Sequence, residues 1–203
     1  MFTGIIQALV PVVGVQNKPG LKSFVLEFSV DLVDDLKIGA SVAIDGACTT
    51  VVNIDGQKVS FDAMEETLQK TTIGRIAEGS KVNIERSAKM GDEIGGHLMS
   101  GHIVGMAQIV GVEEPKNNRV VEFKVPAEWM RYILDKGFIG LDGASLTVVD
   151  PDKMTGTFKV WLIPETLRVT TFGNKGVGDF VNVEINSRTQ TIVDTVEQIM
   201  KSK

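Results

Sequence analysis

The sequence predicts an all-β protein with two tandem copies of a small antiparallel barrel, followed by a C-terminal α-helix. Three observations support this fold class. The 203-residue chain repeats itself, each copy contains short segments with strand periodicity, and the last segment changes to helical periodicity. A repeat of about 100 residues is long enough to enclose a hydrophobic core of its own.

The internal repeat is clearest around two Asp-Gly pairs. The segment AIDGACTTVV at 43–52 matches GLDGASLTVV at 140–149, an offset of 97 residues. The Glu-Thr-Leu and Thr-Thr motifs that follow recur at an offset of 99. The second copy therefore carries two extra residues between the Asp-Gly segment and these motifs. The repeat predicts two domains, residues 1–97 and 98–203.

Four segments of the first copy have the features of β-strands. They are rich in β-branched residues or alternate apolar and polar positions, as half-buried strands do. Asp-Gly pairs separate several of them and predict tight turns. The predicted strands are residues 41–43, 50–54, 58–61 and 81–85. Many short strands at this spacing favour an antiparallel barrel in each copy.

Helices are expected in three places. Residues 31–36 form one candidate, and 126–136 another, with Pro126 suited to the first turn and Gly137 to the C-cap. The third is the tail 189–200, which has no counterpart after the first copy. Its apolar residues fall on one helical face, namely Ile192, Val193, Val196, Ile199 and Met200.

Composition and charge exclude several classes of function. Hydrophobic residues make up 43% and charged residues 23%, as in soluble globular proteins. The net charge of −5 argues against a nucleic-acid partner, which would select a basic surface. No apolar run approaches the roughly 18 residues of a membrane span, and the first residues lack the basic region of a signal peptide. Cys48 is the only cysteine, so we expect a cytoplasmic protein without disulfides or membrane contact.

The repeated polar residues favour two similar ligand pockets. Asp, Gly, Thr and Glu-Thr recur at matched positions near predicted turns and strand ends, where ligands are usually bound. The Asp-Gly pairs alone are better explained as two equivalent turns. The whole set favours two pockets, which suit an enzyme that binds two copies of one ligand, a carrier, or a symmetric scaffold with one inactive site.

The two copies differ at positions that bear on chemistry. Cys48 aligns with Ser145, and His102 aligns with Ile5. Cys48 suits a nucleophile or a buried structural cysteine. His97 and His102, in the glycine-rich segment GGHLMSGH, suit proton transfer or are two ordinary loop histidines. No cluster of cysteines or carboxylates completes a metal site around them, so no bound metal is predicted.

Several motifs together resemble those of the riboflavin synthase family, which is built from lumazine-binding repeats. The motifs are MFTGII at 1–6, CTTV at 48–51, GDEIGGHLMSGH at 91–102, SLTV at 145–148 and LIPETL at 162–167. The resemblance implies two six-stranded Greek-key barrels, and a homotrimer joined through the C-terminal helix. It also implies transfer of a four-carbon unit between two molecules of 6,7-dimethyl-8-ribityllumazine. The products are riboflavin and 5-amino-6-(ribitylamino)uracil, and no metal or separate cofactor takes part.

The resemblance also implies site residues. His102 would transfer protons, while Cys48 and Ser145 would aid addition at ring position 7 of the lumazine or orient a water that adds there. The implied contacts of the first pocket are Gly4, Ile5, Ile6, Ser41, Cys48, Thr49, Thr50, Asp62, Ala63, Met64, Glu65, Glu66 and Thr67. Gly101, His102 and Ile103 join the ligand sites. The implied contacts of the second pocket are Lys136, Ser145, Leu146, Thr147, Trp161, Leu162, Ile163, Pro164, Glu165 and Thr166.

Two positions depart from the family pattern. Thr49 stands where the family usually has leucine, and strand alternation predicts that its side chain points away from Cys48 and Thr50. Asn186 stands where the family often has aspartate, so a hydrogen bond can be kept while a charge is lost.

The main alternative is a non-catalytic carrier of lumazine or flavin from the same superfamily. Such carriers tend to lose the motifs of the second copy and the terminal helix. This chain keeps Ser145, Thr147, the motif Pro164-Glu165-Thr166 and an amphipathic tail, so the enzyme is favoured. An association with lumazine synthase is left open.

Overall fold

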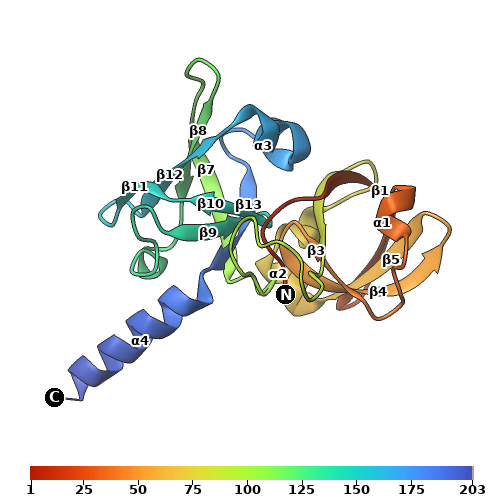
Figure 1. The fold of residues 1–203 in the computed structure, drawn as a ribbon, viewed down its shortest axis with the longest axis horizontal. Helices are drawn as coiled ribbons and strands as arrows, with labels where there is room; N and C mark the ends of the chain where they lie inside the picture. The colour runs from red at the N-terminus through yellow and green to blue at the C-terminus, as the bar shows by residue number, and fades with distance from the viewer. Residues whose placement is uncertain (203) are drawn as a thin grey trace.

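The computed structural model describes residues 1–202 and shows two β-sheet units side by side, with one long helix projecting from the second (Figure 1). The N terminus lies between the units, where Phe2 forms an isolated β-bridge with Met99. No helix within residues 1–202 is long and apolar enough to cross a membrane.

The first unit is a closed antiparallel barrel of six strands. The strand order around the barrel is β1-β2-β5-β4-β3-β6, in which β2 pairs with β5 and β3 pairs with both β4 and β6, as in a Greek key. The four predicted strand segments lie within β3 to β6, which confirms them. The strands are β1 (Ala8–Lys18), β2 (Leu21–Glu27), β3 (Ser41–Ile44), β4 (Ala47–Asp55), β5 (Lys58–Met64) and β6 (Lys81–Arg86).

The second unit follows the same order, but one strand is broken in two. The counterpart of β4 is split at Val148 into β10, which pairs with β9, and β11, which pairs with β12. Asp150 has a positive φ of 49°, and Pro151 has no N–H to donate, so six expected strands become seven. β10 and β11 are the two edge strands of the sheet and follow each other in the chain, so the sheet is curled and its two edges come together at Val148. The strands are β7 (Gly105–Glu113), β8 (Arg119–Lys124), β9 (Phe138–Leu141), β10 (Ala144–Thr147), β11 (Val149–Asp152), β12 (Thr157–Leu162) and β13 (Phe180–Ile185).

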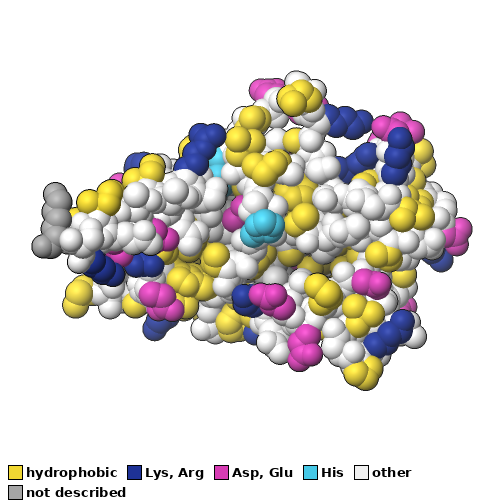
Figure 2. Space-filling model, turned by 90° about the horizontal axis from the view of Figure 1, so that it is seen from below, with side chains coloured by type: hydrophobic (Ala, Val, Ile, Leu, Met, Phe, Trp, Pro, Cys, Tyr) yellow, Lys and Arg dark blue, Asp and Glu magenta, His cyan; other side chains and the backbone are white. Residues whose placement is uncertain are grey.

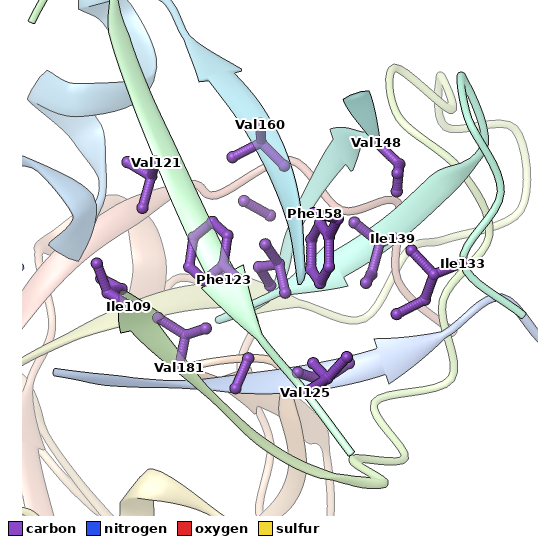
Figure 3. Packing of buried hydrophobic residues seen from close by; sticks show 14 of the residues in the cluster. Ile109, Val121, Phe123, Val125, Ile133, Ile139, Val148, Phe158, Val160 and Val181 are labelled. Atoms are coloured by element: carbon purple, nitrogen blue, oxygen red, sulfur yellow. The ribbon is translucent and has the colours of Figure 1, made fainter. Parts of the chain in front are cut away.

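Each unit encloses its own hydrophobic core because alternate strand residues point inward. Phe24 and Phe61 stack in the first core, with ring centroids 5.7 Å apart. Phe123 and Phe158 stack at 5.6 Å in the second core. Figure 3 shows aliphatic side chains from several strands gathered round this second pair of rings.

Short helices connect the strands of both units. The expected helix at 31–36 forms as a single turn, α1. The structure adds two helices of six residues that begin at matched places in the repeat, too short for their periodicity to be recognised in the sequence. The short elements are α1 (Val30–Val33), α2 (Glu65–Lys70), η1 (Thr72–Arg75), α3 (Pro164–Val169) and η3 (Thr171–Gly173).

The prediction of a helix at 126–136 is wrong. Only η2 (Ala127–Trp129), a 3-10 helix, forms there, and the backbone bonds that follow also join residues three apart. Met130, Tyr132 and Ile133 are all buried. In an α-helix Met130 and Tyr132 would lie on nearly opposite faces, so burying both requires the tighter, irregular turns.

The predicted C-terminal helix is confirmed as α4 (Ser187–Lys201). Asn186 is its N-cap, and the Asn186 Oδ1 accepts a hydrogen bond from the Thr189 N–H at 3.0 Å. Asparagine and aspartate stabilise a helix N-terminus about equally well. The replacement of aspartate by Asn186 therefore leaves this structural role intact.

The two units are joined by an exchange of hydrogen bonds between buried side chains. The amide of Asn83, on β6, donates to the Asp142 carbonyl at 2.9 Å, and its Oδ1 accepts from the Thr171 N–H at 2.8 Å. The same exchange runs in the opposite direction, at 2.8 and 2.7 Å, between Asn182 and the backbone of Asp45 and Thr72. Both asparagines are fully buried. Leaving any of these groups unpaired would cost about 1–3 kcal/mol.

The two Asp-Gly pairs form turns at this junction. Asp45 and Gly46 have φ values of 43° and 79°, and Asp142 and Gly143 have 45° and 83°, as in a type I′ hairpin turn. A Cβ on Gly46 would come within 2.5 Å of the Gly143 nitrogen, so the turns can meet only because both residues are glycine. The interpretation of these pairs as equivalent turns is confirmed.

Asp45 and Asp142 share one cation. The Lys175 ammonium donates to the Asp142 carboxylate, whereas the matching position in the first repeat is Ile76. Burial alone would lower the pKa of Lys175, but the Asp142 and Asp45 carboxylates outweigh it and raise that pKa. Burial raises the pKa of Asp45 to about 7, and the charge of Asp142 adds to the rise. Asp45 is therefore partly protonated near neutral pH in the folded protein.

The Asp45→Asn variant should remove a pH dependence of stability. The pKa of Asp45 is about 7 in the folded protein and near 3.8 for a free side chain. Its contribution to the free energy of unfolding is therefore full below about pH 4 and is lost as the pH rises through 7. Relative to the variant, the wild type should lose up to about 1.4 kcal/mol per pH unit across this window, measured by urea denaturation. The exposed Asp55→Asn change is the control, and a wild type that tracks Asp45→Asn at every pH would contradict the assignment.

Candidate functional site

The segments that precede the two barrels are exchanged between the halves. Gly4 precedes the first barrel, yet its carbonyl accepts the N–H of Ser145 in the second half at 2.8 Å. Gly101 precedes the second barrel, yet its carbonyl accepts the N–H of Cys48 in the first half at 2.9 Å. The surroundings of Cys48 and Ser145 therefore each combine a strand of one half with a segment of the other.

Close packing accompanies this exchange. Gly101 has a φ of +79°, and a Cβ there would lie 2.6 Å from the Cβ of Cys48. A Cβ on Gly4, with a φ of +76°, would lie 2.5 Å from the Cβ of Ser145. Ile103 packs on the core of the first half. Glycine is thus needed at both contacts for its conformation and for its lack of a side chain.

A cavity of about 280 Å³ opens beside Cys48. It joins a thiol, an imidazole, a hydroxyl and a carboxylate on one surface. Glu66 pairs with Lys70 at 2.8 Å, and this interaction lowers the pKa of Glu66. Six of the predicted residues lie together here: Cys48, Glu66, Thr67, Gly101, His102 and Ile103. Ala47, Lys70 and Thr71 complete the lining.

Ser145 differs from Cys48 in having a histidine bonded to it. The Ser145 hydroxyl lies 2.6 Å from Nδ1 of His97, and the His97 ring stacks on Phe138 with centroids 5.1 Å apart. Burial lowers the pKa of His97, so its ring is neutral at neutral pH. Its buried Nε2 faces no hydrogen-bonding partner within residues 1–202. A neutral imidazole bonded to a hydroxyl can accept or return a proton.

A second cavity, of about 540 Å³, borders His97. Lys136 is the one predicted contact that lines it, and His97 and Phe138 form another part of its wall. Thr147, two residues after Ser145 on β10, is exposed on the same face of that strand. The remaining lining residues are Ile94, Gly96, Leu98, Gly137, Asn186, Arg188 and Thr189.

His97 is the site residue to which the sequence assigned no contact. The segment GGHLMSGH indicated that one of its two histidines was suited to proton transfer, and only His102 was placed at a ligand site. The structure brings His97 to Ser145 because Gly96 lets the backbone pass close to that serine, where a Cβ would be 2.6 Å from the Ser145 Cβ. The glycine before His97 was the available signal.

Strand alternation divides the other predicted contacts. Side chains of Ser41, Thr50, Asp62, Met64 and Trp161 are exposed or half-buried. Thr49 points inward, as expected from alternation, and its hydroxyl donates to the Val42 carbonyl at 2.9 Å. The side chains of four predicted contacts face the cores instead of a pocket, so only their backbone groups can reach a ligand. They are Thr49, Ala63, Leu146 and Leu162.

The structure places Gly4 and Ile6 against the second half, and Ile5 is exposed outside the cavity beside Cys48. The Gly4 carbonyl is bonded to Ser145, and Ile6 packs on the core of the second half. Strand order along the chain gives no sign of this exchange, because the contacts span more than a hundred residues of sequence.

The helices that follow the predicted pocket strands begin in the same way in both halves. Glu65, Glu66 and Thr67 form the first turn of α2, and Pro164, Glu165 and Thr166 form the first turn of α3. Exposed Ile163 is the N-cap residue of α3. Glu165 is bonded to Arg168 at 2.6 Å, which lowers its pKa.

The Gly101→Ala variant should disturb the Cys48 cavity. Its Cβ would clash with Cys48 in addition to the strain of a positive φ, so we expect a loss of about 2–4 kcal/mol in the free energy of unfolding. The matched control is Gly39→Ala, because Gly39 has a φ of +88° but nothing within 4 Å of its Cβ position. This control should lose only about 1–2 kcal/mol. Equal losses in urea denaturation would contradict the close approach.

Comparison with known proteins identifies relatives along the whole chain. The lumazine binding domain family matches twice, at residues 3–87 and 100–186. Riboflavin synthase of Escherichia coli (strain K12) is 49% identical over 206 residues, which cover 100% of this chain and 95% of that protein. Riboflavin synthase of Chlamydia pneumoniae is 44% identical over 202 residues, which cover 100% and 98%.

Solved structures with the same fold hold ligands. LumP complexed with riboflavin has a TM-score of 0.85 and 25% identity, covering 92% of this chain and all of that one. LumP complexed with 6,7-dimethyl-8-(1'-D-ribityl) lumazine has a TM-score of 0.82, also at 25% identity, covering 91% and 98%. With two lumazine-binding repeats and relatives 44–49% identical over its full length, the chain belongs to the riboflavin synthase family.

Proposed function

We propose that the chain catalyses the conversion of two 6,7-dimethyl-8-ribityllumazine molecules to riboflavin and 5-amino-6-(ribitylamino)uracil. The observation that carries this proposal is the duplicated site, in which Cys48 of the first repeat and Ser145 of the second occupy equivalent positions. A reaction between two identical molecules needs two similar binding surfaces. The two domains, 1–97 and 98–203, would each hold one lumazine.

Positioning would supply much of the catalysis. A lumazine that loses a proton from its 7-methyl group delocalises the resulting charge into its own ring. Holding two such rings in the reacting geometry can lower the barrier by roughly 7–11 kcal/mol. The exposed faces of β4 and β10, with the hydroxyls of Thr50 and Thr147, offer polar contacts for the ring edges.

The two sites suit different parts of the proton chemistry. Ser145 with His97 forms a hydroxyl–imidazole pair that can move a proton without a charged resting state. Cys48 lies in a cavity with His102, which supplies a second imidazole near the first ligand. We assign addition at ring position 7, or the orientation of a water for that addition, to Cys48 and Ser145.

The carrier alternative receives less support. LumP shares the fold at 25% identity, whereas the riboflavin synthases are 44–49% identical along the whole chain. The second half also keeps polar residues at Ser145, Thr147 and Lys136, of which Ser145 is half-buried and the other two are exposed.

Incubation with 6,7-dimethyl-8-ribityllumazine alone tests the reaction. In the presence of a chelator and without added cofactor, one riboflavin should form for every two lumazines consumed, followed by absorbance and chromatography. Ser145→Ala should lower kcat by about 10²-fold, because it removes the hydroxyl bonded to His97. Thr155→Ala, at an exposed hairpin hydroxyl, should leave kcat unchanged. Tight binding without any riboflavin would favour the carrier.

We further propose a homotrimer joined through α4, in the cytoplasm. Exposed apolar residues lie along this projecting helix (Figure 2), with Ile192 64%, Val196 49% and Ile199 53% exposed. The helix is held at a defined angle, since Glu197 is bonded to Arg131 at 2.8 Å and Asp194 to Tyr132 at 2.6 Å. Such a stripe on a fixed arm suits packing against copies of itself. The free thiol of Cys48 is compatible with a reducing compartment.

Charges placed on this stripe should dissociate the trimer. The double variant Val196→Asp, Ile199→Asp would bury two carboxylates at the helix contact, so sedimentation should report monomers. If the reacting rings come from pockets of neighbouring subunits, the monomer should still bind lumazine but lose turnover about tenfold or more. Gln198→Asp, on the opposite face of α4, is the control. A fully active monomer would place both pockets of one reaction in one chain.

A further inference from the structure

Each repeat carries one buried glutamate on its last strand, at Glu85 in β6 and Glu184 in β13. Both side chains are almost fully buried, at 3% and 4% exposure. Neither is paired with a cation in a salt bridge within residues 1–202. Burial raises the pKa of Glu85, as expected for a carboxyl that lies among neutral donors.

These carboxylates hold the segments that precede the barrels. Glu184 Oε1 accepts from the N–H and the hydroxyl of Ser100 at 2.6 and 2.9 Å, and its Oε2 accepts from the Gly101 N–H at 2.9 Å. Glu85 makes the same three bonds, to Thr3 at 2.6 and 2.8 Å and to Gly4 at 3.0 Å. The two sets of contacts are equivalent in the repeat.

The clamped segments end beside the functional side chains of the opposite half. Gly101, held by Glu184 of the second half, accepts the Cys48 N–H and is followed by His102 in the first cavity. Gly4, held by Glu85 of the first half, accepts the Ser145 N–H. The neighbouring Thr3 carbonyl accepts the His97 N–H at 3.0 Å, so the Glu85 clamp also fixes the backbone of His97.

We propose that Glu85 and Glu184 are positioning residues that act across the junction, each setting the geometry of the pocket in the opposite half. Glu184 sets the position of His102 relative to Cys48, and Glu85 sets the position of His97 and Gly4 relative to Ser145. As a statement about catalysis this inference rests on the proposed function, but as a statement about pocket geometry it does not.

The chemistry of the clamp requires a carboxylate. Three donors converge on two oxygens, and none of them can act as an acceptor except the hydroxyls of Thr3 and Ser100. Glutamine keeps the shape but turns an NH₂ toward one backbone N–H, so at least one donor loses its partner. Hydrogen bonds to charged groups are roughly twice as strong as neutral ones, so the remaining bonds also weaken.

The chain contains its own probes for both pockets. Cys48 is the only cysteine, and His97 and His102 are the only histidines. In the ligand-free protein, the reaction rate of the Cys48 thiol with an aromatic disulfide reports on the first pocket, as does the imidazole NMR signal of His102. The imidazole signal of His97 reports on the second pocket. None of these measurements needs turnover.

Glu184→Gln and Glu85→Gln are the matched pair. Glu184→Gln should change the Cys48 reaction rate by up to about tenfold, since the Gly101 carbonyl that accepts the Cys48 N–H is held less firmly beside the exposed thiol, and should shift His102 while His97 stays in place. Glu85→Gln should shift His97 and leave the Cys48 rate and His102 unchanged. With lumazine, each variant should weaken one of the two binding events and lower kcat. The urea midpoint of unfolding should change little.

The crossed pattern is the decisive result. If Glu184→Gln shifted His97 and left Cys48 and His102 unchanged, if Glu85→Gln changed the Cys48 rate and His102 but not His97, or if both pockets responded equally to both variants, the inference would be overturned. Should a glutamine variant fail to fold, Thr3→Val removes one donor from the Glu85 clamp, and Ser100→Ala removes one donor from the Glu184 clamp together with the hydroxyl that accepts the His102 N–H at 3.2 Å. The same pattern is expected at smaller size, and for Ser100→Ala the Cys48 rate is the probe that decides. A crossed pattern in a protein that never forms riboflavin would uphold the clamps and reject the proposed reaction instead.

Discussion

The hydrogen bonds of Asn83 and Asn182 across the junction are the constraint on which the rest of the structure depends. Each asparagine lies on the last strand of one half and satisfies backbone groups of the other. Because these groups are buried, the halves cannot rotate or slide without leaving several of them unpaired. The two Asp-Gly turns pack directly against each other at this junction, which further restricts how the two halves can be arranged. These polar contacts therefore fix the relative orientation of the two halves.

This orientation decides where the segments before each barrel go. Once the halves are locked, the chain before β1 passes Ser145 and the chain before β7 passes Cys48. Each pocket is therefore lined by residues of both halves. The symmetric frame carries a few asymmetric features, which include Lys175 in place of Ile76 and the thiol of Cys48 in place of the Ser145 hydroxyl. The shared surroundings make the two sites alike in shape, and these substitutions make them different in chemistry.

The sequence predicted what depends on local pattern and missed what depends on contacts between the halves. The repeat, the strands β3 to β6 and the helix α4 follow from periodicity, and the inward direction of Thr49 follows from alternation. The expected helix at 126–136 failed because three buried residues had to point into one core, a tertiary demand that overrides local propensity. The place of Gly4–Ile6 and the partner of Ser145 could not be predicted, since both arise from the exchange across the junction.

A reaction between two identical molecules needs sites that are alike enough to bind the same ring and unlike enough to treat the two rings differently. Two separate copies of one repeat would form two identical sites. A tandem repeat removes that restriction, because each half can change alone while the junction holds the frame. His97 shows the consequence, since it lies in the connection between β6 and β7 and bonds to Ser145, whereas no histidine bonds to Cys48 within residues 1–202. The imidazole at Ser145 can therefore serve one ring of the pair without acting on the other.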